Sequence, residues 1–335
     1  MNAPLDSVLT TDESRFSCQE IPPARTPRTL EDDVREGLLT PPRSLQPKYF
    51  YDDLGSRLFD RICDTPEYYP TRTEAALLAD SADAIMRQTA PDHIIELGSG
   101  ASRKTRHLLD ACAARGQYCR YWPFDVCEPM LRTAGEGLVT DYDWLEVRAL
   151  VGDYMAGLAH LPQPEGRRLF VFLGGTLGNF DPQQAQAFLT ELRRCMRDGD
   201  SLLVGVDRVK DTEVLNAAYN DSQGLTAAFN LNLLNVLNRE LAADFDPGRF
   251  EHTAAFNEQD SQIEMYLIST ERQAVELGAL DETLSLEAGE EILTEISRKF
   301  TPEGLTDLFG AADLRVTDHL EPPNRYFSLL LLEAA

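Results

Sequence analysis

The feature that most constrains the fold is a short apolar run that ends in a glycine-rich turn and leads into a helical pattern. The run is His93-Ile94-Ile95-Glu96-Leu97, the turn is Gly98-Ser99-Gly100, and a helix is expected over about 102–115. Four more apolar runs follow at 119–126, 146–151, 168–174 and 201–207, with helical segments between several of them, notably 182–198. Strands that alternate with helices predict a parallel, doubly wound α/β sheet.

A different style of pattern begins after Asp207. Residues 211–242 read as helix, whereas 262–277 and 284–288 read as strands. The helical period returns at 302–311, and the runs 314–316 and 326–332 predict an antiparallel hairpin at the edge of the sheet. The chain therefore returns to the sheet after an interruption.

The organisation of the chain follows from these changes of pattern. A length of 335 residues suggests about two domains. We expect a smaller α+β domain built from 29–72 and 208–299, and a sheet domain built from 73–207 and 300–335, which opens with a long amphipathic helix at about 73–88. Residues 1–28 are rich in Ser, Thr, Asp and Pro without an apolar period, which predicts a mobile arm.

Composition and charge exclude several classes of function. The 31 basic and 56 acidic residues give a net charge of −25, which repels a phosphate backbone, so no nucleic-acid partner is expected. No apolar run reaches the roughly 18 residues of a membrane span, and the first residues lack the pattern of a secretory signal, which predicts a cytoplasmic protein. Six scattered cysteines and five isolated histidines predict free thiols and no metal site.

Polar residues at successive strand ends point to a nucleoside ligand. Gly98 lets the backbone approach a ligand closely, and Asp125 ends the second strand, where a carboxylate can accept both hydroxyls of a ribose. Asp153 and Tyr154 follow the third strand, where a carboxylate can bind the amino group of adenine and a ring can pack on its face. Each residue alone is also typical of an ordinary turn. Together, and with no phosphate-binding loop in the sequence, they predict S-adenosylmethionine (SAM).

A nicotinamide cofactor fits the same turn less well. A dinucleotide-binding turn has a third glycine near position 103, where this chain has Arg103, and nothing in the sequence marks a site of hydride transfer. An oxidoreductase is therefore disfavoured.

Several separated segments resemble the L-histidine Nα-methyltransferases of ergothioneine biosynthesis, over about residues 45–335. The segments are 51–56 (YDDLGS), 67–74 (EYYPTRTE), 96–100 (ELGSG), 104–106 (KTR), 172–179 (FLGGTLGN) and 295–300 (EISRKF). The resemblance implies a Rossmann-like class I SAM-dependent methyltransferase sheet domain with a second, smaller α+β substrate domain. It also implies a monomeric enzyme that trimethylates the α-amine of L-histidine to give hercynine.

The resemblance further implies roles for single residues. The SAM-binding residues would be Gly98, Lys104, Asp125, Asp153 and Tyr154, with Lys104 at the methionine carboxylate. The substrate-binding residues would be Tyr68 near the α-amine, Asn179 and Tyr219 at the carboxylate, and Glu295 and Ser297 at the imidazole, with Tyr51 orienting. Glu295 and Ser297 alternate by two, so they share a face if this stretch is extended. Glu295 would then accept a ring N–H, and the Ser297 hydroxyl would bind the other nitrogen.

Other interpretations of these residues and of the whole chain stay open at this point. Tyr51 and Tyr68 also suit packing between domains, Glu295 a solvated charge in an acidic run, and Asn179 a turn. The same chemistry on another aromatic amino acid such as tryptophan is the nearest alternative function, but an apolar residue is then expected in place of Glu295. A SAM-binding module without turnover is a third hypothesis.

Overall fold

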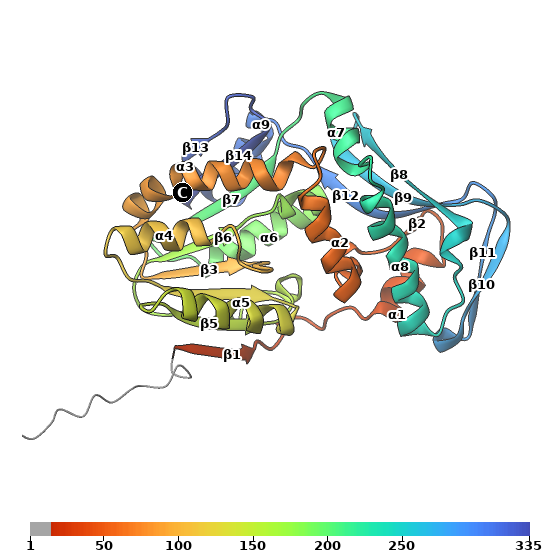
Figure 1. Ribbon diagram of the computed structural model, residues 1–335, viewed down its shortest axis with the longest axis horizontal. Coiled ribbons are helices and arrows are strands. Elements are labelled where there is room, and N and C mark those ends of the chain that lie inside the picture. The colour runs from red at the N-terminus through yellow and green to blue at the C-terminus, as the bar shows by residue number, and fades with distance from the viewer. Residues whose placement is uncertain (1–14) are drawn as a thin grey trace, which may run out of the picture.

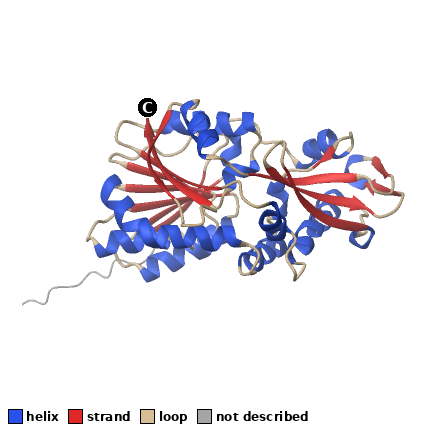
Figure 2. Cartoon of the chain, turned by 90° about the horizontal axis from the view of Figure 1, so that it is seen from above, coloured by secondary structure: helices blue, strands red, loops and turns tan. Residues whose placement is uncertain are grey.

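A computed structural model describes residues 15–335 as two lobes, one around an eight-stranded sheet and one around a four-stranded sheet (Figure 2). The large sheet has the order β1-β5-β4-β3-β6-β7-β14-β13. Its strands are β1 (Phe16–Glu20), β3 (His93–Leu97), β4 (Arg120–Asp125), β5 (Glu146–Val151), β6 (Arg168–Phe172), β7 (Ser201–Asp207), β13 (Leu314–Leu320) and β14 (Phe327–Ala334). Neighbours from β1 to β7 run parallel, and β14 and β13 continue the sheet antiparallel. The expected hairpin at the sheet edge is confirmed.

Helices cover both faces of this sheet (Figure 1). One face packs against α3 (Tyr69–Thr89), α4 (Arg106–Ala114) and α5 (Glu128–Asp141), and the other against α6 (Pro182–Cys195) and α9 (Pro302–Gly310). Strands β3, β6 and β7 are buried along their whole length, as continuous apolar runs require. The predicted doubly wound α/β sheet is therefore confirmed.

The second lobe combines a small sheet with helices around one core. Its sheet has the order β2-β12-β9-β8, formed by β2 (Arg43–Ser44), β8 (Phe250–Asn257), β9 (Gln262–Ser269) and β12 (Glu291–Arg298), beside the pair β10 (Gln273–Leu277) and β11 (Glu282–Leu286). Its helices are α1 (Leu30–Asp33), α2 (Asp53–Cys63), α7 (Thr212–Tyr219) and α8 (Leu225–Leu241). Leu233 and Leu237 of α8 share this core with Ile263 and Leu267 of β9.

Short helical turns connect these elements. They are the π-helical turn η2 (Val34–Leu38) and the 3₁₀ turns η3 (Pro47–Phe50), η4 (Tyr154–Ala156), η5 (Thr176–Asn179), η6 (Pro247–Arg249) and η7 (Gly278–Leu280). Turns η3, η4 and η5 carry or adjoin residues expected at the site.

The buried cores divide along the chain in the same way as the lobes. The core of the second lobe takes its buried residues from 34–69 and 215–292, and the two cores of the sheet lobe take theirs from 77–206 and 300–332, with Ile21 added. We therefore propose that 29–72 with 208–299 form one domain and 73–207 with 300–335 the other.

The N-terminal arm differs from the expectation. Residues 1–14 lie outside the described part, but Phe16–Glu20 form strand β1 and are not a mobile segment, because they pair in parallel register with Val147–Val151 of β5. Phe16 also packs on α5 so closely that a Cβ on Gly135 would lie 2.3 Å from its ring.

Two expected helices also have different limits. The predicted helix at 211–242 is broken between α7 and α8, where the Asp221 carboxylate accepts the backbone N–H groups of Leu225 and Thr226 and so caps α8. Helix α4 begins only at Arg106, after a turn in which Ser102 has a positive φ of 54°.

Candidate functional site

The glycine turn after β3 is tied to the end of β4. The Gly100 N–H donates to one carboxylate oxygen of Asp125 at 3.0 Å, and the Cys127 N–H donates to the other oxygen at 3.0 Å. Each of these oxygens keeps a further lone pair, so the carboxylate remains able to accept two hydroxyl groups. The turn itself is exposed at Gly98, which has a φ of +68°.

The ring of Tyr154 lies next to this turn. A Cβ on Gly98 would lie 3.6 Å from the Tyr154 ring, which contacts Phe172 and Phe188 at centroid distances of 5.8 Å. Burial raises the pKa of the Tyr154 hydroxyl, and the charges of Asp125 and Asp153 raise it further, so the two carboxylates lie close to it. Asp153 uses one oxygen to accept the Met155 N–H at 2.7 Å. The structure thus brings four of the five expected SAM residues together at the ends of β3, β4 and β5.

The fifth expected SAM residue, Lys104, is engaged by a carboxylate. Its ammonium contacts Glu74 of α3, which is fully buried and also accepts the Gly174 N–H at 2.9 Å. The Lys104 ammonium therefore lies at the end of β6, and Glu74 balances its charge. A carboxylate of a bound ligand would interact with this ammonium together with Glu74.

A second group of residues surrounds the end of β12. The hydroxyls of Tyr219 and Ser297 lie 2.8 Å apart, and the buried Lys299 ammonium donates to both, at 2.9 and 2.8 Å. The same ammonium lies 3.1 Å from a carboxylate oxygen of Asp207, at the end of β7. Side chains from β7, α7 and β12 are thus joined at one buried cation.

Glu295 shares this region with Asn179. Both Glu295 and Ser297 lie on the extended strand β12, as the alternation required. Burial raises the pKa of Glu295 to about 7, although the Lys299 charge and a hydrogen bond from Asn179 oppose the rise. The Asn179 amide also donates to the Ile296 carbonyl at 3.1 Å, which fixes η5 against β12.

Two tyrosines of the second lobe lie near the residues around the end of β12. Tyr68 is buried and meets the Tyr219 ring edge-on at 6.1 Å, whereas Tyr51 remains 44% exposed and meets Phe59 and Phe229 edge-on. The surrounding protein raises the pKa of both hydroxyls well above the ordinary value, and the Glu295 charge adds to the rise. Tyr154 also contributes to the raised pKa of Tyr51, so the Tyr51 hydroxyl lies near both groups of residues.

A match to a known family accompanies this geometry. Residues 30–334 match the family described as "Histidine-specific methyltransferase, SAM-dependent". The chain belongs to this family. Its eight-stranded sheet is accordingly the sheet of a SAM-dependent methyltransferase.

Individual relatives agree with the family. Histidine N-alpha-methyltransferase of Mycolicibacterium smegmatis is 47% identical over 302 residues, covering 90% of this chain and 94% of that protein. The protein of the same name from Mycobacterium tuberculosis is 48% identical over 285 residues, covering 85% and 88%. Ergothioneine biosynthesis protein 1 of Schizosaccharomyces pombe is 30% identical over 253 residues, covering 72% of this chain and 32% of that longer protein.

The histidine-specific methyltransferase family is named for SAM, and the residues at the strand ends fit that molecule. Asp125 keeps lone pairs for hydroxyl groups, and the Tyr154 ring lies beside an exposed glycine. Over residues 15–335 no set of three or more His, Cys, Asp or Glu side chains is arranged to hold a metal ion. No helix in that range is long and apolar enough to cross a membrane.

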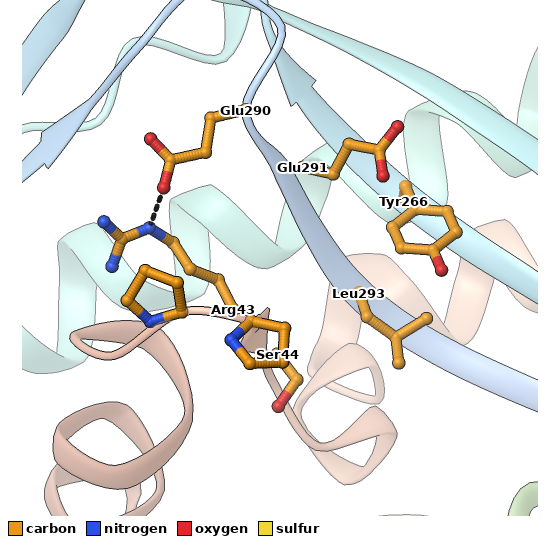
Figure 3. A pocket seen from close by; sticks show the side chains of 8 residues that line it. Arg43, Ser44, Tyr266, Glu290, Glu291 and Leu293 are labelled. Carbon is orange, nitrogen blue, oxygen red and sulfur yellow. Dashed lines mark hydrogen bonds and ion pairs between the residues drawn. The ribbon is translucent and has the colours of Figure 1, made fainter.

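A separate hollow of about 380 Å³ lies along β2 and β12 (Figure 3). Its lining residues are Pro41, Pro42, Arg43, Ser44, Tyr266, Glu290, Glu291 and Leu293, none of which belongs to the expected site. Arg43 is already bound by Glu290 at 2.6 Å and by the Leu38 carbonyl at 2.6 Å. The hollow therefore offers no free cation, and its position does not connect it with methyl transfer.

Sequence reasoning assigned no role to Glu74, Asp207 or Lys299. Glu74 and Lys299 stand inside the segments that carry the family resemblance, so their presence there was the available signal. Asp207 ends an apolar strand, where a carboxylate is common, and only the fold shows what it binds.

Proposed function

We propose that the protein is a SAM-dependent N-methyltransferase that adds methyl groups to the α-amine of L-histidine, in ergothioneine biosynthesis. The observation that carries the proposal is the pair Glu295 and Ser297 on β12. A carboxyl group and a hydroxyl group there face the same region as the tyrosines and Asn179, and suit the two nitrogens of an imidazole. Family membership and the mycobacterial relatives support the same substrate.

The SAM-binding residues would be Gly98, Lys104, Asp125, Asp153 and Tyr154. Asp125 would bind the ribose hydroxyls, Asp153 the adenine amino group, and Tyr154 would pack on the adenine face. Lys104 would bind the methionine carboxylate while remaining paired with Glu74. When bound there, SAM supplies an electrophilic methyl group.

The substrate would be held at both ends. Asn179 and Tyr219 would donate to the carboxylate of histidine, and Glu295 and Ser297 would bind its ring. Tyr68 would lie at the α-amine, with Tyr51 orienting it. Fixing both ends positions the amine nitrogen in line with the methyl carbon and sulfur, and such alignment supplies much of the catalysis in a displacement reaction.

The tyrosines also suit the change of charge at the nitrogen. An ammonium has no lone pair and must first lose its proton to solvent, which partial burial favours by lowering its pKa. The raised pKa values keep the Tyr51 and Tyr68 hydroxyls neutral, so they act as hydrogen-bond partners and not as ionised bases. Their ring faces attract the cationic nitrogen as methyl groups accumulate, which supports trimethylation to hercynine.

The test is to incubate the purified protein with SAM and each of the twenty amino acids separately, and to follow methyl addition by mass spectrometry. Histidine alone should gain up to three methyl groups. Methylation of tryptophan in its place would contradict the assignment of Glu295 and Ser297 to the ring. SAM binding without any methylated product would show a binding module and not an enzyme.

We also propose that the enzyme is a cytoplasmic monomer. All six cysteines are free thiols in the structure, which fits a reducing compartment. Light scattering of the purified chain should give the mass of one copy, 37.5 kDa; twice that mass would contradict the monomer.

A further inference from the structure

The Lys299 ammonium restricts what the two hydroxyls beside it can offer to a ligand. An ammonium has three N–H donors and no lone pair, and Lys299 directs them at Ser297, Tyr219 and Asp207, at 2.8, 2.9 and 3.1 Å. Each hydroxyl oxygen therefore gives one lone pair to Lys299. Tyr219 and Asp207 hold the pKa of Lys299 above its ordinary value although burial opposes this, so the donors are always present near neutral pH.

The hydrogen bond between Ser297 and Tyr219 uses one more proton and one more lone pair. Each hydroxyl has one proton and two lone pairs. After the bonds to Lys299 and the 2.8 Å bond between the hydroxyls, the pair retains one proton on one oxygen and one lone pair on the other. In the structure the Tyr219 hydroxyl donates to Ser297, which leaves the outward proton on Ser297 and the outward lone pair on Tyr219. Rotation of both hydroxyls gives the reverse arrangement, in which Tyr219 donates outward and Ser297 accepts.

The chemistry of an amino acid selects between these two arrangements. A carboxylate only accepts hydrogen bonds, whereas an imidazole nitrogen either donates or accepts. With the substrate carboxylate at Tyr219, that hydroxyl must donate, so Ser297 must accept a proton from the ring. We propose that Lys299 is a positioning residue that couples the two hydroxyls: it occupies one lone pair of each, so that when Tyr219 donates to the substrate carboxylate, Ser297 is left as the acceptor of a ring N–H. This inference rests on the proposed function.

The polarity has a consequence for Glu295. If one ring nitrogen donates its N–H to Ser297, the other ring nitrogen faces Glu295. In a neutral imidazole this second nitrogen carries a lone pair, which an ionised Glu295 carboxylate would repel. One proton must therefore be shared between Glu295 and that nitrogen. The groups that face Glu295 from the surrounding elements are Lys299, Asn179, Tyr51, Tyr68 and Tyr219. Burial raises the pKa of Glu295 to about 7, so the carboxyl group holds such a proton at moderate cost.

The polarity is tested with 3-(imidazol-4-yl)propionate, which keeps the ring and carboxylate of histidine but lacks the titrating amine. Its inhibition constant against histidine is measured at pH 7 and pH 8. If the complex holds the shared proton, the constant rises about fourfold between these pH values, given ring and Glu295 pKa values of about 6.5 and 7. If Ser297 donates to the ring and no proton is shared, the constant falls about twofold, which overturns the assigned polarity.

The role of Lys299 is tested with Lys299→Met and a matched control, Lys210→Met. Both lysines bind Asp207, but Lys210 otherwise contacts Tyr69 at 2.5 Å and reaches neither hydroxyl of the pair. Asp207 keeps Tyr69 and the other lysine in each variant, so both should fold. Lys299→Met should raise KM for histidine at least tenfold without changing the dissociation constant of SAM, and Lys210→Met should change KM less than twofold. Equal effects of the two variants would overturn the inference.

A second comparison distinguishes a general structural role of Lys299 from its positioning of the Ser297 and Tyr219 hydroxyls. In a Ser297→Ala, Tyr219→Phe background, Lys299→Met should change kcat/KM for histidine less than twofold, because its targets are gone. The same fold-loss in both backgrounds would show that Lys299 acts otherwise. A wild-type protein that leaves histidine unmethylated would overturn the proposed function itself, whereas these variant results bear on Lys299 alone.

Discussion

The carboxylate of Glu74 binds the Lys104 ammonium directly behind the Gly174 turn at the end of β6. Glu74 comes from the first half of α3 and is fully buried, and its place is left free by Gly205 of β7, where a Cβ would lie 1.8 Å from its oxygen. The cation at the expected methionine end of the SAM site is therefore held by a buried carboxylate of helix α3.

Removal of this carboxylate should destabilise the fold. Glu74→Ala leaves Lys104 without its partner and the Gly174 N–H without its acceptor, so we expect a loss of about 3–5 kcal/mol in the free energy of unfolding. Urea unfolding measures it. The control is Asp60→Ala, which breaks the exposed pair with Arg103 and should cost less than about 1 kcal/mol. Similar costs for the two variants would show that the buried pair contributes little.

Substitutions in the two groups of site residues should each weaken the binding of one ligand and not the other. Glu295→Ala should weaken histidine binding by roughly 10–100-fold and leave SAM binding unchanged, because a hydrogen bond to a charged group contributes about 1.5–3 kcal/mol. Asp125→Ala should do the opposite. Isothermal titration of each variant with each ligand gives the four constants. Unchanged histidine affinity in Glu295→Ala would remove that residue from the ring site.

The approach of SAM to the glycine turn should be sensitive to a single methyl group. Gly98→Ala places a side chain at a φ of +68°, which costs about 1–2 kcal/mol, and narrows the space beside Tyr154. Gly116→Ala is the matched control, because Gly116 has a φ of +63° and nothing within 4 Å of a Cβ there. Both variants should lose similar stability in urea, but only Gly98→Ala should bind SAM more weakly. Equal SAM affinities would place the ligand away from Gly98.

The stability of the protein should depend on pH through Glu96. Burial raises the pKa of Glu96 to about 7 from 4.5, although hydrogen bonds from Thr105 and Tyr121 oppose the rise. Between these values the folded state keeps a proton that the unfolded state has lost, so the free energy of unfolding falls as pH rises, by up to about 1.4 kcal/mol per pH unit. Glu96→Gln removes this contribution, so urea unfolding from pH 5 to pH 7 should show a flatter dependence than in the wild type. Parallel curves would mean that Glu96 is ionised in the folded state throughout.

The parts of the fold that the sequence revealed are those encoded locally. The run from His93 to Gly100 carries both its strand and its turn in adjacent residues, and Asp125 follows from its place at a strand end. Strand β1 was missed because Phe16–Glu20 is short and follows a polar segment. It is stabilised by pairing with β5 and by packing of Phe16 on α5, which are contacts far along the chain.

The same distinction holds in the candidate site. The alternation of Glu295 and Ser297 was visible as a period of two, and the structure places both on one strand. The partners of Lys299 were not visible, because Asp207 and Tyr219 come from separate segments and only the packing of the two lobes brings them to one ammonium. In the sequence alone, a lysine that becomes buried cannot be told from a lysine on the surface.

The position of β14 between β7 and β13 bears on how the chain reaches its native state. Residues 208–326, which include most of the second lobe, are synthesised between β7 and the strand that covers its edge. Until β14 arrives, β7 presents an unpaired edge, with the apolar run 202–204 in its middle, that is able to pair with other chains. Synthesis of the second lobe thus delays completion of the large sheet. A chain whose synthesis stops within the second lobe would be released with β7 unpaired, and its sheet would be prone to aggregation.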